Sequence, residues 1–357
     1  MVRQWMNAAG YLAIYLMPGL LLAGAYTGRP WLAFGVVVLV FSLLRLVFGA
    51  MLPRAPDWHE AVATFLDRLP LGYPVVFPVA VLGSLWSMVA SAPTFADWLG
   101  YGLSFWMTAL FGTCVVHELI HRRDPVQAMT GHVLAGMCGH PLLGAEHLAH
   151  HARPGDAERA EVPRRHESVW GFAVRRLARI AREFAGPGAA LWAGTPVPAT
   201  VVRVRWAFAA MGVMVIAFGA IAGWPGTLLF GLVAIGVSFG VQIITYIQHW
   251  ALGDDSLGDA VGYGRGWDDD CQFQAWITLN ISLHDEHHRE PRLPYYRLQL
   301  ASDSPRLPAG YVMLMFLALV PSIWRRAMEP ALTRWFEQPA EPMSAGRRLT
   351  CFGLPAH

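Results

Sequence analysis

Residues 98–121 read WLGYGLSFWMTALFGTCVVHELIH, an apolar run that ends in two histidines with a glutamate between them. A helix of about 20 mostly apolar residues is long enough to cross a membrane. His117 and His121 are four positions apart, so a helix would place them on one face. The run therefore predicts a transmembrane helix that ends in a pair of metal-binding side chains.

Three further groups of histidines lie at or shortly after hydrophobic stretches, and the four groups together hold nine of the fourteen histidines. The nine are His117, His121, His147, His150, His151, His249, His284, His287 and His288. On helices, the spacings HxxxH and HxxHH would aim two or three imidazoles of each group at one point. Imidazole nitrogen suits iron, zinc, copper and nickel. Since nine ligands exceed what one ion can hold, the pattern predicts two metal ions. His59, His166 and His357 fit scattered surface histidines instead.

The composition is too apolar for an ordinary soluble domain, because 55% of the 357 residues are hydrophobic and the mean hydropathy is +0.37. Every basic residue is arginine, and the arginines cluster beside apolar stretches, so nucleic-acid binding is not indicated. The cysteines Cys114, Cys138, Cys271 and Cys351 form no CxxC pair, which excludes a rubredoxin-like iron site. Any electron carrier must then be a separate protein.

Six apolar stretches predict an all-α integral membrane protein with six transmembrane helices, in a single domain over residues 1–357. They are Tyr11–Thr27, Trp31–Leu52, Leu71–Ala90, Trp98–His121, Trp206–Trp224 and Thr227–Trp250. The connections after the first, third and fifth contain a single arginine, Arg29, and nearly all other arginines lie in the opposite connections. The positive-inside rule then predicts cytoplasmic segments 122–205 and 251–357 in a bacterial inner membrane. All nine histidines would meet on the cytoplasmic side.

Val126–Ala145 is about long enough for a further span, but its glycines, its proline and its two histidines favour a helix that is interfacial or packed against the bundle. Had it crossed, the second histidine group would lie on the wrong side of the bilayer. We expect His132 and His140 to be hydrogen-bonded helix residues rather than ligands.

Other segments have simpler expectations. We expect Arg45, inside the second stretch, to extend its charge to the interface. The aspartate-rich segment Asp254–Asp270 predicts a solvated loop, and Val169–Phe184 predicts an amphipathic helix on the membrane surface. Tyr311–Trp324 is too short for a seventh span.

Two alternative metal chemistries share part of the pattern. HELIH is an instance of HExxH, the zinc site of metalloproteases, and could indicate an intramembrane zinc protease. That interpretation leaves most of the other histidines without a role. The same segment contains ExxH, but a soluble carboxylate-bridged di-iron bundle needs two such motifs and two further glutamates. Only one good ExxH is present.

The whole pattern resembles the membrane fatty-acid desaturase and hydroxylase superfamily, and within it the alkane 1-monooxygenase and xylene monooxygenase group. The resemblance covers residues 98–298 approximately. Its motifs are HELIHRR at 117–123, EHLAHH at 146–151, HESVWGF at 166–172, TYIQHWAL at 245–252 and LHDEHHREPRLPYYRL at 283–298. The lone histidine in a Tyr-x-x-His-aromatic context is typical of this group.

This resemblance implies a non-haem di-iron monooxygenase in which the nine histidines hold two iron ions. With O2 as co-substrate, such an enzyme hydroxylates a terminal methyl group of an alkane or alkyl chain to a primary alcohol. Xylene- or toluene-type methyl hydroxylation of alkylbenzenes and fatty acyl desaturation stay open. Glu118, Glu146 and Asp285 adjoin the histidines, and we expect them to accept hydrogen bonds from ligand imidazoles, which orients the rings.

The resemblance also implies partners. Electrons would come from a rubredoxin or ferredoxin with its reductase, and Arg153, Arg159, Arg164 and Arg165 predict a basic surface for an acidic carrier. The apolar substrate would enter from the membrane lipid through a channel between helices. Candidate lining residues are Trp98, Phe105, Phe111 and Trp250.

Overall fold

The computed structural model describes residues 1–357 apart from 52–55, 153–155, 157–160, 186–198, 253–265 and 338–357. Across the described residues the secondary structure is helical, with two isolated β-bridges, so the expected all-α class is confirmed. The expectations for Arg153, Arg159, Cys351, His357 and residues 254–265 concern positions outside this described part.

Within the described residues, four helical segments are long and apolar enough to cross a membrane. They are Val2–Tyr26 (α1 Val2–Gly10, η1 Tyr11–Tyr15 and α2 Leu16–Tyr26), α5 (Glu60–Ala90), α6 (Phe95–Ile120) and α10 (Ala199–His249). These segments contain the first, third and fourth of the six expected stretches almost entirely. Their length and composition are those of an integral membrane protein.

The fifth and sixth expected stretches are two arms of α10. The ring centroids of Phe218 and Phe230 are 5.2 Å apart, whereas twelve residues of a straight helix would separate them by about 18 Å. The chain therefore reverses between them, at Gly223, whose φ of 64° is a conformation that glycine adopts without steric cost. Pro225 lies two residues later, and the two arms run back along each other.

The second expected stretch is shorter than predicted. It consists of α3 (Leu32–Gly35), a π-helical turn η2 (Val36–Phe41) and α4 (Ser42–Phe48), a continuous apolar helix from Leu32 to Phe48. The helix ends at Gly49, which has a φ of 65°. Six full-length spans are therefore not confirmed.

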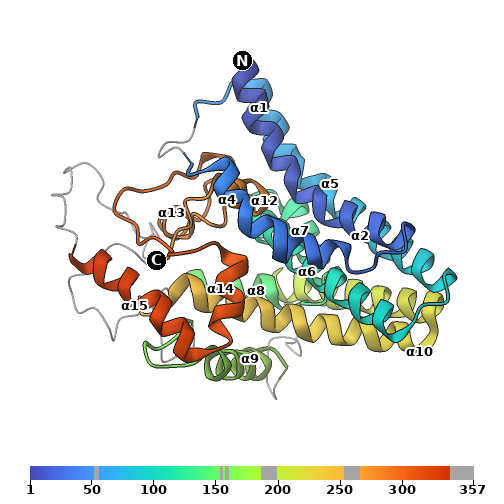
Figure 1. Ribbon diagram of the computed structural model, residues 1–357. Coiled ribbons are helices and arrows are strands. Elements are labelled where there is room, and N and C mark those ends of the chain that lie inside the picture. Colours follow the sequence, from blue (N-terminus) through green and yellow to red (C-terminus); the bar gives the residue numbers. More distant parts are fainter. Residues whose placement is uncertain (52–55, 153–155, 157–160, 186–198, 253–265, 338–357) are drawn as a thin grey trace.

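Figure 1 shows α2, α5, α6 and α10 running together, with the turns after α2 and α5 and the reversal in α10 at one end. The shorter helices lie at the opposite end of this bundle (Figure 1). They are α8 (Leu143–Ala152), α9 (Val169–Ala185), α12 (Gln272–Ile277), α13 (His284–Arg289), η5 (Tyr295–Arg297), α14 (Tyr311–Ala318) and α15 (Pro321–Glu337). The expected helix at 169–184 is thus confirmed as α9, and Tyr311–Trp324 is divided between α14 and α15.

Residues 126–145 do not form a span, as expected. They form α7 (Pro125–Met137), a turn and the start of α8, with α7 packed against α6 and α10. The packing is close, because a Cβ on Gly136 would lie 1.9 Å from the backbone oxygen of Ala207. Gly139, with a φ of 87°, lies in the turn after α7 and redirects the chain into α8.

The expectation of a solvated aspartate-rich loop is wrong for two of its described residues. Asp268 and Asp269 are fully buried instead of solvated. Arg45 has a partner that the sequence did not indicate, since its Nη1 lies 2.7 Å from Oδ1 of Asp269, and its position at the membrane interface stays an expectation. Asp268 accepts hydrogen bonds from the backbone N–H of Asp285 (2.9 Å) and from the hydroxyl of Ser304 (2.7 Å). Buried carboxylates require such partners, and these partners are distant in the sequence.

Candidate metal centre

The nine predicted histidines come together at one end of the bundle and divide into two adjacent groups of potential ligands. The donor nitrogens within each group lie within 4.8 Å of one another. The group of five contains His117, His121, His147, His151 and His287, and the group of four contains His150, His249, His284 and His288.

Four helices supply the two groups, and two of those helices supply both. The C-terminal end of α6 gives His117 and His121, and the C-terminal end of α10 gives His249. Helices α8 and α13 contribute three histidines each, and each of these two helices supplies both groups. Because α6 and α10 end on the same side of the bundle, residues more than a hundred positions apart meet there.

The sequence-based picture of each HxxHH aiming at a single point is therefore corrected. On α8, His147 and His151 join the group of five, while His150 joins the group of four. On α13, His284 and His288 join the group of four, while His287 joins the group of five. Residues four apart differ by only about 40° around a helix and stay together, whereas the histidine between them points to the neighbouring group.

The group of four forms a closed ring of nitrogens. The Nε2–Nε2 distances are 3.0 Å from His150 to His249, 2.8 Å from His249 to His284, 3.0 Å from His284 to His288 and 3.3 Å from His288 back to His150. Neighbouring ligands at right angles around an ion are about 3.0 Å apart when metal–nitrogen distances are about 2.1 Å. The ring thus fits a bound metal ion.

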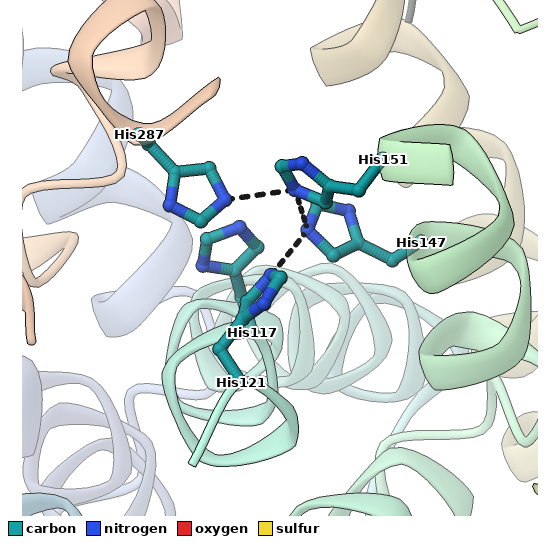
Figure 2. Close-up of side chains that lie close together, drawn as sticks. All are labelled: His117, His121, His147, His151 and His287. Carbon is teal, nitrogen blue, oxygen red and sulfur yellow. Dashed lines mark hydrogen bonds between the residues drawn. The ribbon is translucent and has the colours of Figure 1, made fainter. Parts of the chain in front are cut away.

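The group of five converges in the same way, as Figure 2 shows. The Nε2 of His147 lies 2.9 Å from those of His121 and His151, and the Nε2 of His287 lies 2.9 Å from that of His151. The ring centroid of His117 is 4.4 Å from that of His147 and 4.3 Å from that of His287. Its Nε2 is buried and has no hydrogen-bond partner among the described residues. A metal ion would satisfy this nitrogen.

The protonation of these imidazoles favours metal binding. Burial lowers the pKa of His151 to about 4. Burial and the neighbouring histidines also lower the pKa values of His147, His150, His287 and His288 well below the ordinary value. These rings are therefore neutral near pH 7, which is the form that coordinates a metal.

An apolar pocket between α6, α10 and α14 reaches both groups. His117 and His147 of the group of five line it, as do His150, His249 and His284 of the group of four. Its remaining walls are largely aliphatic and aromatic, and include Met107, Leu110, Phe111, Val241, Ile244, Val312 and Met315. The arrangement can hold an apolar molecule against two neighbouring metal positions.

Of the four aromatic residues expected at a substrate channel, Phe111 lines this pocket. Phe105 stacks instead on Phe218, with ring centroids 5.3 Å apart. Trp250 packs edge-on against Trp324, and Trp98 packs against the core. These three serve helix packing.

The carboxylates expected to orient the histidines have other contacts. Glu118 pairs with Arg122 on the next turn of the chain, at 2.7 Å. Glu146 contacts the Nε2 of His140 at 3.0 Å and the side-chain amide of Gln242 at 3.1 Å. Oδ2 of Asp285 lies 2.6 Å from a guanidinium nitrogen of Arg289. Their role in orienting the ligand rings is not tested by these contacts.

A carboxylate that the sequence did not single out lies beside a ligand histidine. Glu161 is fully buried, and its Oε2 is 3.6 Å from Nδ1 of His150. Glu161 lies ten residues beyond the HxxHH segment, among arginines and a proline. Neither its spacing nor its neighbours distinguish it from a solvated charge, so only the folded structure places it at the site.

The remaining histidines are mostly as predicted. His140 is hydrogen-bonded to Glu146 and Ser238, although it lies in the turn before α8 and not in a helix. His132 lies in helix α7 and in neither ligand group, as expected, but it is buried without a hydrogen-bond partner among the described residues, so the expected hydrogen bond is absent there. His59 and His166 are exposed, as expected for surface histidines.

The amino-acid sequence is similar to those of known monooxygenases. The alkane 1-monooxygenase 1 of Pseudomonas aeruginosa is 26% identical over 335 residues, which cover 85% of this chain and 84% of that protein. The alkane 1-monooxygenase of Pseudomonas putida is 22% identical over 337 residues, covering 83% and 76%. The xylene/toluene monooxygenase hydroxylase component XylM of Pseudomonas putida is 22% identical over 244 residues, covering 66% and 65%.

These relatives confirm the resemblance to the alkane and xylene monooxygenase group. The family model described as fatty acid desaturase matches residues 96–318, which include all nine histidines of the two groups. The match covers more than half of the sequence, and the chain belongs to the fatty acid desaturase family.

Proposed function

We propose that this protein is a membrane monooxygenase that uses O2 and two iron ions to hydroxylate a terminal methyl group of an alkane or alkyl chain to a primary alcohol. The observation that carries this proposal is the apolar pocket that ends against two adjacent groups of histidines. Similarity to proteins named alkane 1-monooxygenase supports it.

The histidines would hold the metal ions in two positions. His117, His121, His147, His151 and His287 would hold one, and His150, His249, His284 and His288 the other. Iron bound there would supply the activation of O2 and the oxidation of a carbon–hydrogen bond. Imidazole donors suit iron as well as zinc, copper and nickel.

The protein's own contribution is binding, orientation and the exclusion of water. The side chains of Leu110, Val241 and Met315 offer an apolar surface to a hydrocarbon chain, and the histidine end of the pocket receives the methyl group. Helices α6, α10 and α14 line the pocket, and an apolar substrate bound there would displace water from the histidine end. Exclusion of water protects an oxidising reaction from side reactions.

Two other reactions are compatible with the same site. The similarity to XylM favours methyl hydroxylation of an alkylbenzene as the second candidate. Fatty acyl desaturation would need the same histidines and a different product. A zinc protease based on HELIH is not supported, because Glu118 pairs with Arg122 and three further histidines share the group of His117 and His121, beside a second group of four.

The proposal includes an orientation and an electron donor. The arginine distribution favours a cytoplasmic position for the histidine end, in an inner membrane. A separate rubredoxin or ferredoxin with its reductase would deliver the electrons. Arg164 and Arg165 are exposed beside α9 and offer positive charge to such an acidic carrier.

The test uses membranes that contain this protein, a rubredoxin or ferredoxin with its reductase, NADH and ¹⁸O2. The substrates are a mixture of alkanes, alkylbenzenes and fatty acyl chains, and the products are identified by mass spectrometry. We expect a primary alcohol with one ¹⁸O atom, and no product from the His249→Ala variant or without the carrier. An alkene without ¹⁸O would instead identify a desaturase, and peptidase activity with zinc alone would refute the proposal.

A further inference from the structure

Glu161 lies in the loop before α9 and directs a buried carboxylate at one ligand of the group of four. Its Oε2 is 3.6 Å from the Nδ1 of His150. The other ring nitrogen of His150, Nε2, lies 3.0 Å from the Nε2 of His249 and 3.3 Å from that of His288. The imidazole therefore presents one edge to the nitrogen ring and the opposite edge to Glu161.

The Nδ1 of His150 has no hydrogen-bond partner among the described residues, although it is buried. When Nε2 binds a metal ion, the ring proton must be on Nδ1, since a neutral imidazole has one protonated nitrogen. A buried N–H without an acceptor is unfavourable. Among the described residues, the Glu161 carboxylate is the acidic group within ion-pair distance of this nitrogen, and a small rotation of the His150 ring would close the gap to a hydrogen bond.

The carboxylate is held in place from its other side. The Nη1 of Arg176 lies 3.0 Å from Oε2 of Glu161 and donates to its backbone oxygen at 2.9 Å. Arg179 contacts Oε1 at 2.5 Å. Arg176 is itself fully buried on the inner face of α9, where helical amphipathicity alone would place an apolar residue. Two arginines thus fix one carboxylate behind one histidine.

We propose that Glu161 is a positioning residue of the metal centre, which accepts a hydrogen bond from Nδ1 of His150 and thereby orients this ring and strengthens its bond to the metal ion. The inference rests on the proposed metal-binding function. A carboxylate behind a ligand histidine typically changes metal affinity by about 10- to 100-fold. The effect falls on the group of four, because His150 belongs to that group.

The test compares metal binding by the full-length protein and by three variants in detergent or nanodiscs. Glu161→Gln keeps the shape and removes the charge, and Glu161→Asp keeps the charge on a shorter side chain. Glu183→Gln is the matched control, since exposed Glu183 pairs with the same Arg179 at 2.9 Å and lies on the solvent side. Fe²⁺ and Co²⁺ are titrated into the metal-free proteins, and the visible spectrum of bound Co²⁺ reports the ligand environment.

We expect two bound ions in the wild-type protein and in Glu183→Gln. In Glu161→Gln, one ion should bind about 10- to 100-fold more weakly with an altered Co²⁺ spectrum, while the other binds normally. Glu161→Asp should be intermediate. Equal affinities and spectra in Glu161→Gln and Glu183→Gln would overturn the role of Glu161, whereas a wild-type protein that binds no ion would overturn the proposed function itself. If Glu161→Gln does not fold, Glu161→Asp tests the proposal instead. Metal binding by Glu161→Asp with the same affinity and spectrum as the wild-type protein would refute it.

Discussion

Gly144 lies in the first turn of α8, directly against the ring of the buried His132 on α7. A Cβ at Gly144 would lie 2.4 Å from Cε1 and 2.7 Å from Nδ1 of that ring. Ordinary contacts between carbon atoms are about 3.5 Å or more, so Gly144→Ala must open this contact by about 1 Å. Because the His132 ring is fully buried, we expect part of this shift to fall on α8. Overpacking of this kind costs about 1–3 kcal/mol.

The displacement would reach the metal centre, because α8 carries His147, His150 and His151. Metal sites tolerate displacements of only about 0.5 Å. If the whole cost fell on metal binding, 1–3 kcal/mol would weaken it about 5- to 150-fold. The assay is Fe²⁺ titration of the purified protein, with the half-life of unfolding at raised temperature as a second reading.

Gly212→Ala is the control, since a Cβ there meets nothing within 4 Å. That variant should bind metal normally and gain about 0.5–1 kcal/mol of helix stability. Adding His132→Ala to Gly144→Ala removes the clashing ring and should restore most of the affinity, as a double-mutant cycle would measure. Normal metal binding by Gly144→Ala alone, or no restoration in the double variant, would refute the steric reasoning.

Four further variants or treatments test other contacts. Asp268→Ala removes the acceptor for the Asp285 N–H at the start of α13, which should cost about 1–3 kcal/mol of stability and accelerate iron loss. Unchanged iron retention would show that this hydrogen bond does not hold α13 in place. Arg45→Gln leaves the buried Asp269 without its guanidinium and should shorten the half-life of unfolding, with a cost of about 1–3 kcal/mol. Removing iron with a chelator should lower thermal stability by about 4 kcal/mol for each bound ion, relative to protein in iron at 1,000 times its Kd. An unchanged melting temperature would argue against a folded-state metal site. Replacing exposed His166 by alanine should leave activity and iron content unchanged, so a loss of iron would show that the ligand set is incomplete.

The sequence predicted the helical class and the nine histidines because both depend on local patterns. Hydrophobic run length marks a membrane helix, and HxxxH or HxxHH spacing marks a shared helix face. How α8 and α13 divide their histidines between two groups was not predicted. That division depends on how each helix is rotated relative to α6 and α10, which is set by tertiary packing such as the contact between Gly144 and His132.

The charged residues around the site were predicted least well. Asp268, Asp269 and Glu161 look like solvated acids in the sequence, and each is fully buried. Their partners lie far away in the chain: Arg45 is 224 residues from Asp269. A buried charge is compatible with folding only when the tertiary structure brings a partner to it, so no local pattern reveals it. Glu118, Glu146 and Asp285 adjoin the histidines in the sequence, but their contacts in the structure are with Arg122, His140 and Arg289.

The length of the second apolar stretch was overestimated for a related reason. Apolar residues continue through residue 52, but the helix stops at Phe48, where Gly49 adopts a positive φ. The next residue, Ala50, forms an isolated bridge with Cys271, in the segment that leads to α12. The helix therefore ends where the chain makes a tertiary contact, whereas hydropathy alone predicts a helix through residue 52.

The proposed function requires that nine histidines hold two iron ions, in a group of five and a group of four. Anomalous X-ray scattering at the iron absorption edge, from crystals of the iron-loaded protein, locates these ions. We expect two iron peaks per chain, one among His117, His121, His147, His151 and His287 and one among His150, His249, His284 and His288. A single peak, or iron bound away from these histidines, would contradict it.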